Sequence, residues 1–210
     1  MVWTPPTVTP ASLPSRPTEG PTMRDYAAVY PSMGAVSEAL RSAPRGSLTA
    51  DDFEELQVKA GRNHAPELLH QAWFGAKMAP GELAGAAVSA WTSAEYPQEA
   101  LGRQTWLDIF ADAGFSIDGR PAERPAGTVQ LFRGATHKRR RMMAWTTSRE
   151  VSESFAHGGL GGRGLGQVWT TTAPPAAMLA IVGAYGREGE DEYIIDTRGL
   201  TIVPADRGRS

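Results

Sequence analysis

The sequence predicts an α+β protein in which a helical segment precedes a strand-rich half. Between residues 47 and 115, apolar side chains recur at the spacing of amphipathic helices. After a turn-rich stretch at 116–127 the pattern changes to short apolar runs, which are typical of strands and continue to residue 204. Hydrophobic residues make up 41% of the 210 positions and charged residues 21%, which is sufficient for a core and excludes wholesale disorder.

Residues 1–46 differ in composition from the rest of the chain. Six prolines lie among the first 21 residues, together with Thr, Ser and Gly. Proline removes backbone donors, and this stretch has little apolar surface to bury. We therefore predict a proline-rich, partly disordered lead that acts as a spacer rather than as a docking ligand. One or two short helices are expected over 24–42, interrupted at Pro31.

Four helices are expected in the segment 47–115. They cover residues 50–60, 66–77, 80–91 and 97–113. Thr49 is placed to cap the first helix and Gly61 to end it. The aromatic residues recur at helical spacing, which favours a core over a ligand-binding cluster.

Short strands are expected in the segment 128–204, which begins after the linker 116–127. They cover residues 128–133, 142–147, 167–172, 178–182, 192–195 and 200–203. A helix at 149–156, with Ser148 as its N-cap, separates two of them. The chain is thus divided into the lead 1–46, the helical segment 47–115 and the β-rich half 128–204, and the last two can form one domain.

Composition and residue spacing exclude several classes of function. The chain has no cysteine, which rules out disulfide scaffolds, cysteine nucleophiles and thiolate metal sites. Its net charge of -2 argues against a protein built throughout as a nucleic-acid binder. The histidines at 64, 70, 137 and 157 lack metal-ligand spacing, and neither a Gly-x-Ser-x-Gly elbow nor a P-loop occurs. We therefore expect no metal.

The first ten residues, MVWTPPTVTP, lack the basic and apolar regions of a classical signal peptide. No apolar run approaches the roughly 20 residues that a membrane helix needs. We therefore expect a cytoplasmic protein without a membrane partner, which is compatible with delivery into another cell by machinery that reads no signal peptide.

Three segments of the β-rich half place polar residues where a simple strand would be apolar. Arg133 and Gly134 end an apolar strand, and a guanidinium beside a glycine can take a phosphate at close range. The hydroxyl triplet 146–148 follows the next strand. Glu190 and Glu192 alternate, so on a strand both project to one side and can divide the work of glycosidic chemistry. The simpler explanations are a solvent-facing arginine, a helix cap and an acidic loop.

In this order, the arginine, the hydroxyl triplet and the Glu-x-Glu strand resemble the arginine–serine–glutamate class of ADP-ribosyltransferases, the cholera-toxin-like class. The resemblance covers residues 128–196, about a third of the chain, and none of the helical segment. It implies an ADP-ribosyltransferase-like split β-sandwich for the β-rich half. It also implies that NAD is the substrate and binds in a cleft between two small sheets.

The resemblance implies a role for each matching residue on the first two strands. Arg133 corresponds to the arginine that holds NAD phosphate or ribose, and Gly134 to the residue whose backbone meets the nicotinamide amide. Thr146, Thr147 and Ser148 correspond to the family's Ser-Thr-Ser triplet. Thr146, which would support the catalytic glutamate, keeps the hydroxyl and adds a methyl group.

On the last strand, Glu192 corresponds to the catalytic glutamate, which holds a hydroxyl of the nicotinamide ribose and favours an oxocarbenium-like centre. Glu190 corresponds to the residue that activates the acceptor, and a glutamate there goes with arginine acceptors. Phe155 matches in spacing the aromatic that packs on nicotinamide in several members, or it is simply the core anchor of its helix. The glycine-rich segment 157–166 corresponds to a mobile loop closing over NAD, with Arg163 reaching phosphate, or it is a flexible surface hairpin.

The run of basic residues at 137–141 is the concentrated basic patch of the chain. It can contact nucleic acid or the adenylate side of NAD. A solvated loop is the interpretation we favour for it.

The sequence therefore predicts a mono-ADP-ribosyltransferase that transfers ADP-ribose from NAD to a macromolecular acceptor and releases nicotinamide. Protein arginine is the first acceptor expected. Three alternatives stay open: an NAD glycohydrolase with water as the acceptor, a nucleic-acid ADP-ribosyltransferase, and a non-enzymatic interaction or structural protein with a degenerate transferase-like fold.

Overall fold

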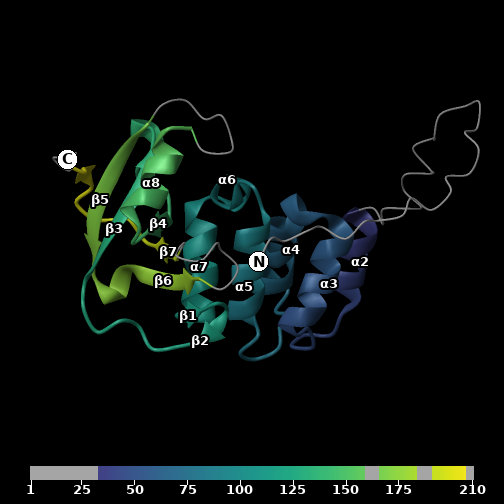
Figure 1. The fold of residues 1–210 in the computed structure, drawn as a ribbon. Helices are drawn as coiled ribbons and strands as arrows, with labels where there is room; N and C mark the ends of the chain where they lie inside the picture. Colours follow the sequence, from purple (N-terminus) through teal and green to yellow (C-terminus); the bar gives the residue numbers. More distant parts are fainter. Residues whose placement is uncertain (1–32, 159–165, 184–190, 207–210) are drawn as a thin grey trace, which may run out of the picture.

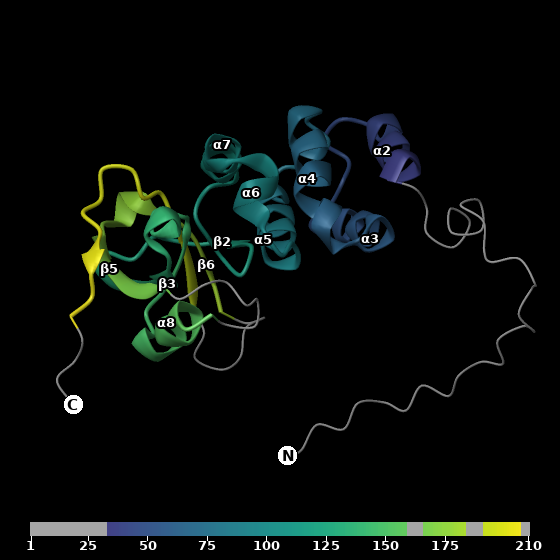
Figure 2. The same cartoon turned by 90° about the horizontal axis from the view of Figure 1, so that it is seen from above.

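The computed structural model describes residues 33–158, 166–183 and 191–206, and these form a mixed α+β structure, as the sequence predicts (Figure 1). The helices of the first half are arranged beside the strands and lead away from them, so that α2 is the most distant (Figure 2). Most of the predicted lead lies outside the described residues, as do Arg163 and Glu190.

The helices follow the predicted order along the chain. They are α2 (Met33–Ser42), α3 (Ala50–Ala60), the 3₁₀ helix η1 (Arg62–His64), α4 (Ala65–Phe74), α5 (Leu83–Ser93), α6 (Pro97–Leu101), α7 (Arg103–Ala113) and α8 (Arg149–Ala156). The caps predicted for α3 are confirmed. The Thr49 hydroxyl accepts from the Asp52 amide at 3.1 Å, the Asp52 carboxylate accepts from the Thr49 amide at 2.9 Å, and Gly61 ends the helix.

The single helix predicted over 97–113 is wrong, because Gly102 separates α6 from α7. Its φ of +76° lies in the left-handed region that favours glycine, and its amide ends α6 by donating to the Gln98 carbonyl at 2.9 Å. Two other helices have shifted bounds: that expected at 80–91 is Leu83–Ser93, and that expected at 66–77 is Ala65–Phe74.

The strands form one hydrogen-bonded sheet in the order β2-β1-β6-β7-β4-β3-β5-β8. Their bounds are β1 (Ser116–Ile117), β2 (Arg120–Pro121), β3 (Val129–Ala135), β4 (Ala144–Thr146), β5 (Gln167–Ala173), β6 (Met178–Val182), β7 (Glu192–Ile195) and β8 (Val203–Pro204). The strands predicted at 128–133, 167–172, 178–182 and 192–195 are confirmed to within two residues. The strand predicted at 142–147 is shorter and corresponds to β4. The strand predicted at 200–203 corresponds to β8, which begins only at residue 203.

The linker predicted at 116–127 contains two strands that the sequence did not suggest. Asp118 and Gly119 both have positive φ, at 50° and 75°, which is the backbone of a tight type I′ hairpin turn between β1 and β2. Ser116 and Ile117 also pair in parallel with β6. The segment is therefore the edge of the sheet rather than a free connection.

The pairing between neighbouring strands is shortest between β3 and β4. The two strands share one register pair, Phe132 with Thr146, whereas β3 pairs with β5 along its whole length from Val129 to Ala135. The expected two small sheets are therefore one continuous sheet, because the short strand β4 connects its two parts. On one side lie β3, β5 and β8, and on the other lie β7, β6, β1 and β2.

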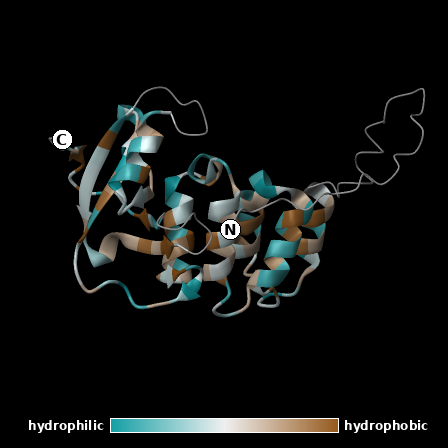
Figure 3. Ribbon diagram, in the orientation of Figure 1, coloured by the Kyte–Doolittle hydropathy of each residue, from teal (hydrophilic) through white to brown (hydrophobic). Residues whose placement is uncertain are grey.

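A hydrophobic cluster joins the helices to the sheet. It contains buried residues of α2–α5 and α7 together with Ala180 of β6 and Ile194 of β7. Trp91, Trp106 and Phe110 pack at its centre, with ring centroids 5.0–6.1 Å apart. Apolar residues run along the helices and along β6 (Figure 3). The helical segment and the β-rich half therefore pack directly on each other.

Helix α8 packs on β3 at Gly134, where no side chain fits. A Cβ at this position would lie 1.8 Å from the Ser152 carbonyl oxygen and 2.4 Å from the Ala156 amide nitrogen. Both atoms belong to the backbone of α8, so the helix itself would have to move. Glycine at 134 thus sets the distance between α8 and the sheet.

Replacing Gly134 with alanine should destabilise the fold by at least about 2 kcal/mol, because overpacking against backbone cannot be relieved by a side-chain rotation. Urea unfolding followed by circular dichroism measures the change. Gly127→Ala is the matched control, since a Cβ there meets nothing within 4 Å. Equal stability of the two variants would contradict the tight packing of α8.

Candidate functional site

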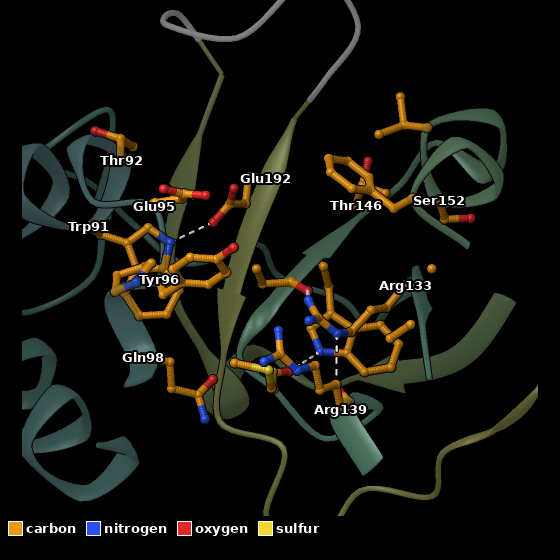
Figure 4. A pocket seen from close by; sticks show the side chains of 18 of the residues that line it. Trp91, Thr92, Glu95, Tyr96, Gln98, Arg133, Arg139, Thr146, Ser152 and Glu192 are labelled. Atoms are coloured by element: carbon orange, nitrogen blue, oxygen red, sulfur yellow. Dashed lines mark hydrogen bonds between the residues drawn. The ribbon is translucent and has the colours of Figure 1, made fainter. Parts of the chain in front are cut away.

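A cavity of about 610 Å³ lies between the helical half and the sheet (Figure 4). One wall consists of the end of α5 and the residues that follow it, among them Trp91, Glu95 and Tyr96. The other consists of β3, β4, the start of β7 and helix α8. The volume falls within the roughly 300–1,000 Å³ typical of small-molecule sites.

The three polar segments that the sequence singled out meet on neighbouring strands. Thr146 of β4 is paired with Glu192 of β7 on one side and with Phe132 of β3 on the other. Residues directly opposite each other in antiparallel strands project to the same face of a sheet, so the Thr146 and Glu192 side chains are neighbours. Arg133 is the next residue of β3, and it lines the same cavity.

The Glu192 carboxylate is held by a residue of the helical half. The indole Nε1 of Trp91 donates to Glu192 Oε1 at 2.6 Å (Figure 4). Burial raises the pKa of Glu192, and it does so against two opposing influences, the Trp91 hydrogen bond and the positive charge of Arg133. The site thus holds a partly buried carboxylate that receives a hydrogen bond from Trp91 and the positive field of Arg133.

Arg133 is fixed by backbone carbonyls on the floor of the cavity. Its Nε donates to the Arg139 carbonyl at 3.1 Å and its Nη1 to the Ala144 carbonyl at 2.5 Å. These two backbone carbonyls orient the guanidinium, whose positive charge also acts on Glu192. The arginine predicted to meet phosphate is therefore a preorganised cation at the cavity.

The hydroxyl triplet separates into three environments. Thr146 is buried and its Oγ1 accepts from the Ser148 amide at 3.0 Å. Ser148 caps α8 as predicted, accepting from the Val151 amide at 3.2 Å. Thr147 is exposed. Of the three, Thr146 alone lines the described cavity, and the structure does not bring Thr147 and Ser148 to it.

Phe155 and Gly134 are both at the cavity, on opposite sides of the α8–β3 contact. The side chain of Phe155 is 58% exposed, so its interpretation as the core anchor of α8 is wrong. Its exposed ring lines the cavity and offers a flat apolar surface to a ligand. The backbone of Gly134 is covered by α8 through Ser152 and Ala156.

The basic run at 137–141 lies at the surface, where His137, Lys138 and Arg141 are exposed. Its arginines also contact other parts of the chain. Arg139 forms an ion pair with Glu99 at 2.7 Å, the Arg140 guanidinium lies over the Trp169 ring at 5.6 Å, and Arg141 donates to the Thr197 carbonyl at 3.2 Å.

The helical wall of the cavity is the part that the sequence did not predict. Trp91 lies at helical spacing among core residues, so nothing in the pattern separates it from a purely structural tryptophan. The polar residues of this wall come from the end of α5, from the start of α6 and the connection between them, and from η1; they are Thr92, Glu95, Tyr96, Gln98 and Arg62.

No protein-family model matches this sequence, and neither a curated protein nor a solved structure is similar to it. Within residues 33–158, 166–183 and 191–206, no helix is both long and apolar enough to cross a membrane. The same ranges contain no group of three or more His, Asp or Glu side chains that could hold a metal ion.

Replacing Glu192 with glutamine should raise the melting temperature at pH 7–8. A raised pKa means that the folded state binds the proton more tightly than the unfolded chain. Protonated Glu192 therefore contributes to the stability of the fold at low pH, and this contribution is lost as the pH rises through the folded-state pKa. Glutamine keeps an acceptor for Trp91 without the charge. In a domain of this size each kcal/mol gained corresponds to roughly 2–4 °C.

The gain should shrink as the pH falls below the folded-state pKa and should vanish near the unfolded-state pKa of about 4.3. Thermal unfolding of both proteins between pH 4 and 8 measures it, with the exposed Glu123→Gln as the control. A melting temperature equal to or below that of the wild type at pH 8 would contradict the raised pKa of Glu192.

Proposed function

We propose that this protein is a mono-ADP-ribosyltransferase that uses NAD as its substrate. One observation carries the proposal: Thr146 and Glu192 face each other across neighbouring strands at a cavity that also contains the fixed guanidinium of Arg133. The resemblance in the β-rich half rests on these same three positions. In this proposal the two halves of a split β-sandwich would correspond to the two parts of the sheet that meet at the single register pair between β3 and β4.

The residues at the cavity suit cleavage of the bond between nicotinamide and ribose. The ionised Glu192 carboxylate accepts from a ribose hydroxyl and stabilises positive charge that develops at C1′ as the bond breaks. The bonding electrons leave with nicotinamide, which departs neutral. Arg133 attracts the pyrophosphate, and the exposed ring of Phe155 packs on the nicotinamide.

The acceptor then attacks C1′ and gives up a proton. Protein arginine is the acceptor that we propose first, since Glu190 in the sequence matches the position associated with arginine acceptors. Glu190 lies outside the described residues, so this choice rests on the sequence alone. Water in place of the acceptor would make the same site an NAD glycohydrolase.

Purified protein should release nicotinamide from NAD, and Glu192→Ala should lower the rate by at least about 100-fold, because a carboxylate that stabilises the transition state is lost. Chromatography of the released nicotinamide measures the rate. Glu123→Ala, an exposed glutamate away from the cavity, should keep the wild-type rate. Equal rates for all three proteins would contradict the assignment of Glu192.

Radiolabelled NAD distinguishes the acceptors. Label transferred to an arginine-containing peptide supports the transferase, and nicotinamide release with no label on protein or nucleic acid indicates the glycohydrolase. A wild-type protein that neither releases nicotinamide with lysate present nor gains thermal stability from millimolar NAD would favour a non-enzymatic interaction protein.

As the pH is lowered, the rate should begin to fall at a higher pH than it would if Glu192 had the usual pKa of a glutamate. Burial raises the pKa of Glu192, and the reaction needs the ionised carboxylate. The plot of kcat/KM against pH should therefore rise through a pKa above the usual value of about 4.3 and then level off. An acid limb at or below 4.3 would contradict the buried environment of Glu192.

A further inference from the structure

Glu192 is in contact with a part of the chain outside the segment that resembles the transferase family. Trp91 belongs to α5, 101 residues before Glu192, and its indole N–H donates to the carboxylate at 2.6 Å. An N–H bonded to a charged oxygen at this distance is a strong, directional contact. Figure 4 shows the Trp91 indole and Glu192 directed at each other across the boundary between helices and sheet.

The position of the indole is fixed by the core of the helical half. Trp91 is only 4% exposed, and its ring meets Trp106 edge to face at 5.0 Å and Phe110 at 6.1 Å. An aromatic side chain packed in this way has little freedom to rotate. Its N–H therefore points at one place, and that place is Glu192 Oε1.

We propose that Trp91 is a positioning residue, whose indole N–H holds the Glu192 carboxylate in its reactive orientation and in its ionised form. This inference rests on the proposed function, because it assigns Trp91 to the reaction that Glu192 performs. It makes the helical half an integral part of the active site.

The hydrogen bond acts on a carboxylate whose burial is costly. The Trp91 hydrogen bond and the positive charge of Arg133 both favour the ionised carboxylate. Without the indole donor, the charge of Arg133 would remain to offset the cost of burial. The carboxylate would then ionise at higher pH and rotate more freely. The other charged or titratable groups on the described walls of the cavity are Arg62, Glu95 and Tyr96 from the helical side, and Arg139 and Asp191 from the side of the sheet.

Trp91→Phe tests the inference because it removes the N–H and keeps an aromatic ring. Trp169→Phe is the matched control. Trp169 is also buried, but its indole N–H donates to the Ala135 carbonyl at 2.9 Å, and it lies in the second hydrophobic cluster, away from Trp91 and from the lining of the cavity. Both variants lose the packing volume and the N–H of one buried tryptophan, so a general effect of core packing would appear in both.

We expect Trp91→Phe to lower kcat for nicotinamide release by about 10–100-fold, the loss of one hydrogen bond to a charged group, with a smaller change in KM. Its acid limb should move to higher pH. Trp169→Phe should keep the acid limb of the wild type. A Trp91→Phe profile that superimposes on that of Trp169→Phe would overturn the inference.

A second measurement needs no activity. In ¹H–¹⁵N spectra, the indole resonance that disappears in Trp91→Phe should shift with pH in the wild type and stop shifting in Glu192→Gln. An indole resonance that does not respond to Glu192 would overturn the inference even in an active enzyme. If the resonance responds but the wild type releases no nicotinamide, the proposed function has failed while the contact between Trp91 and Glu192 stands.

Discussion

The Glu192 side chain is partly buried where the helices meet the sheet, and the surrounding structure has to compensate for its charge. A carboxylate taken out of water is costly unless donors and positive charge receive it. Trp91 supplies the donor from the helical side and Arg133 the positive field from the sheet. The indole is in turn placed by Trp106 and Phe110, so the aromatic core of the helices determines the environment of the carboxylate.

Next to this carboxylate, the ladder of paired residues between β3 and β4 is short. β3 and β4 share one register pair, and beyond it the Arg133 side chain, rather than a longer ladder, bonds the Ala144 carbonyl of β4. The strands can thereby diverge beside the cavity without leaving that carbonyl unsatisfied. Gly134 then allows α8 to approach β3 closely enough to form the adjacent wall.

Local sequence patterns were sufficient to predict the caps and most of the strands. Thr49 and Ser148 are caps because their hydroxyls reach amides within the next turn, and the strands around Arg133, Thr146 and Glu192 follow from short apolar runs. The resemblance implied one cleft for the three polar motifs, and Arg133, Thr146 and Glu192 line one cavity, whereas Thr147 and Ser148 do not. Phe155 had two possible roles, and its exposure removes one of them.

What the sequence did not predict depends on contacts between distant segments. Trp91 has the spacing of a core residue and is one, yet its N–H serves a carboxylate 101 positions away. The strands β1 and β2 were missed because two residues are too few to show the alternation of apolar and polar side chains that marks a strand. β1 is defined by its pairing with β6, which the local sequence does not reveal. The helix 97–113 was extended across Gly102 because its apolar spacing continues on both sides of the break.

The central claim is that NAD binds at this cavity with its nicotinamide ribose beside Glu192. A crystal structure of the Glu192→Gln variant with NAD tests it most directly, because the substitution keeps the acceptor for Trp91 while slowing cleavage. We predict intact NAD with its ribose hydroxyls at residue 192, its pyrophosphate toward Arg133 and its nicotinamide against Phe155. NAD bound elsewhere, or an empty cavity at millimolar NAD, would contradict the account.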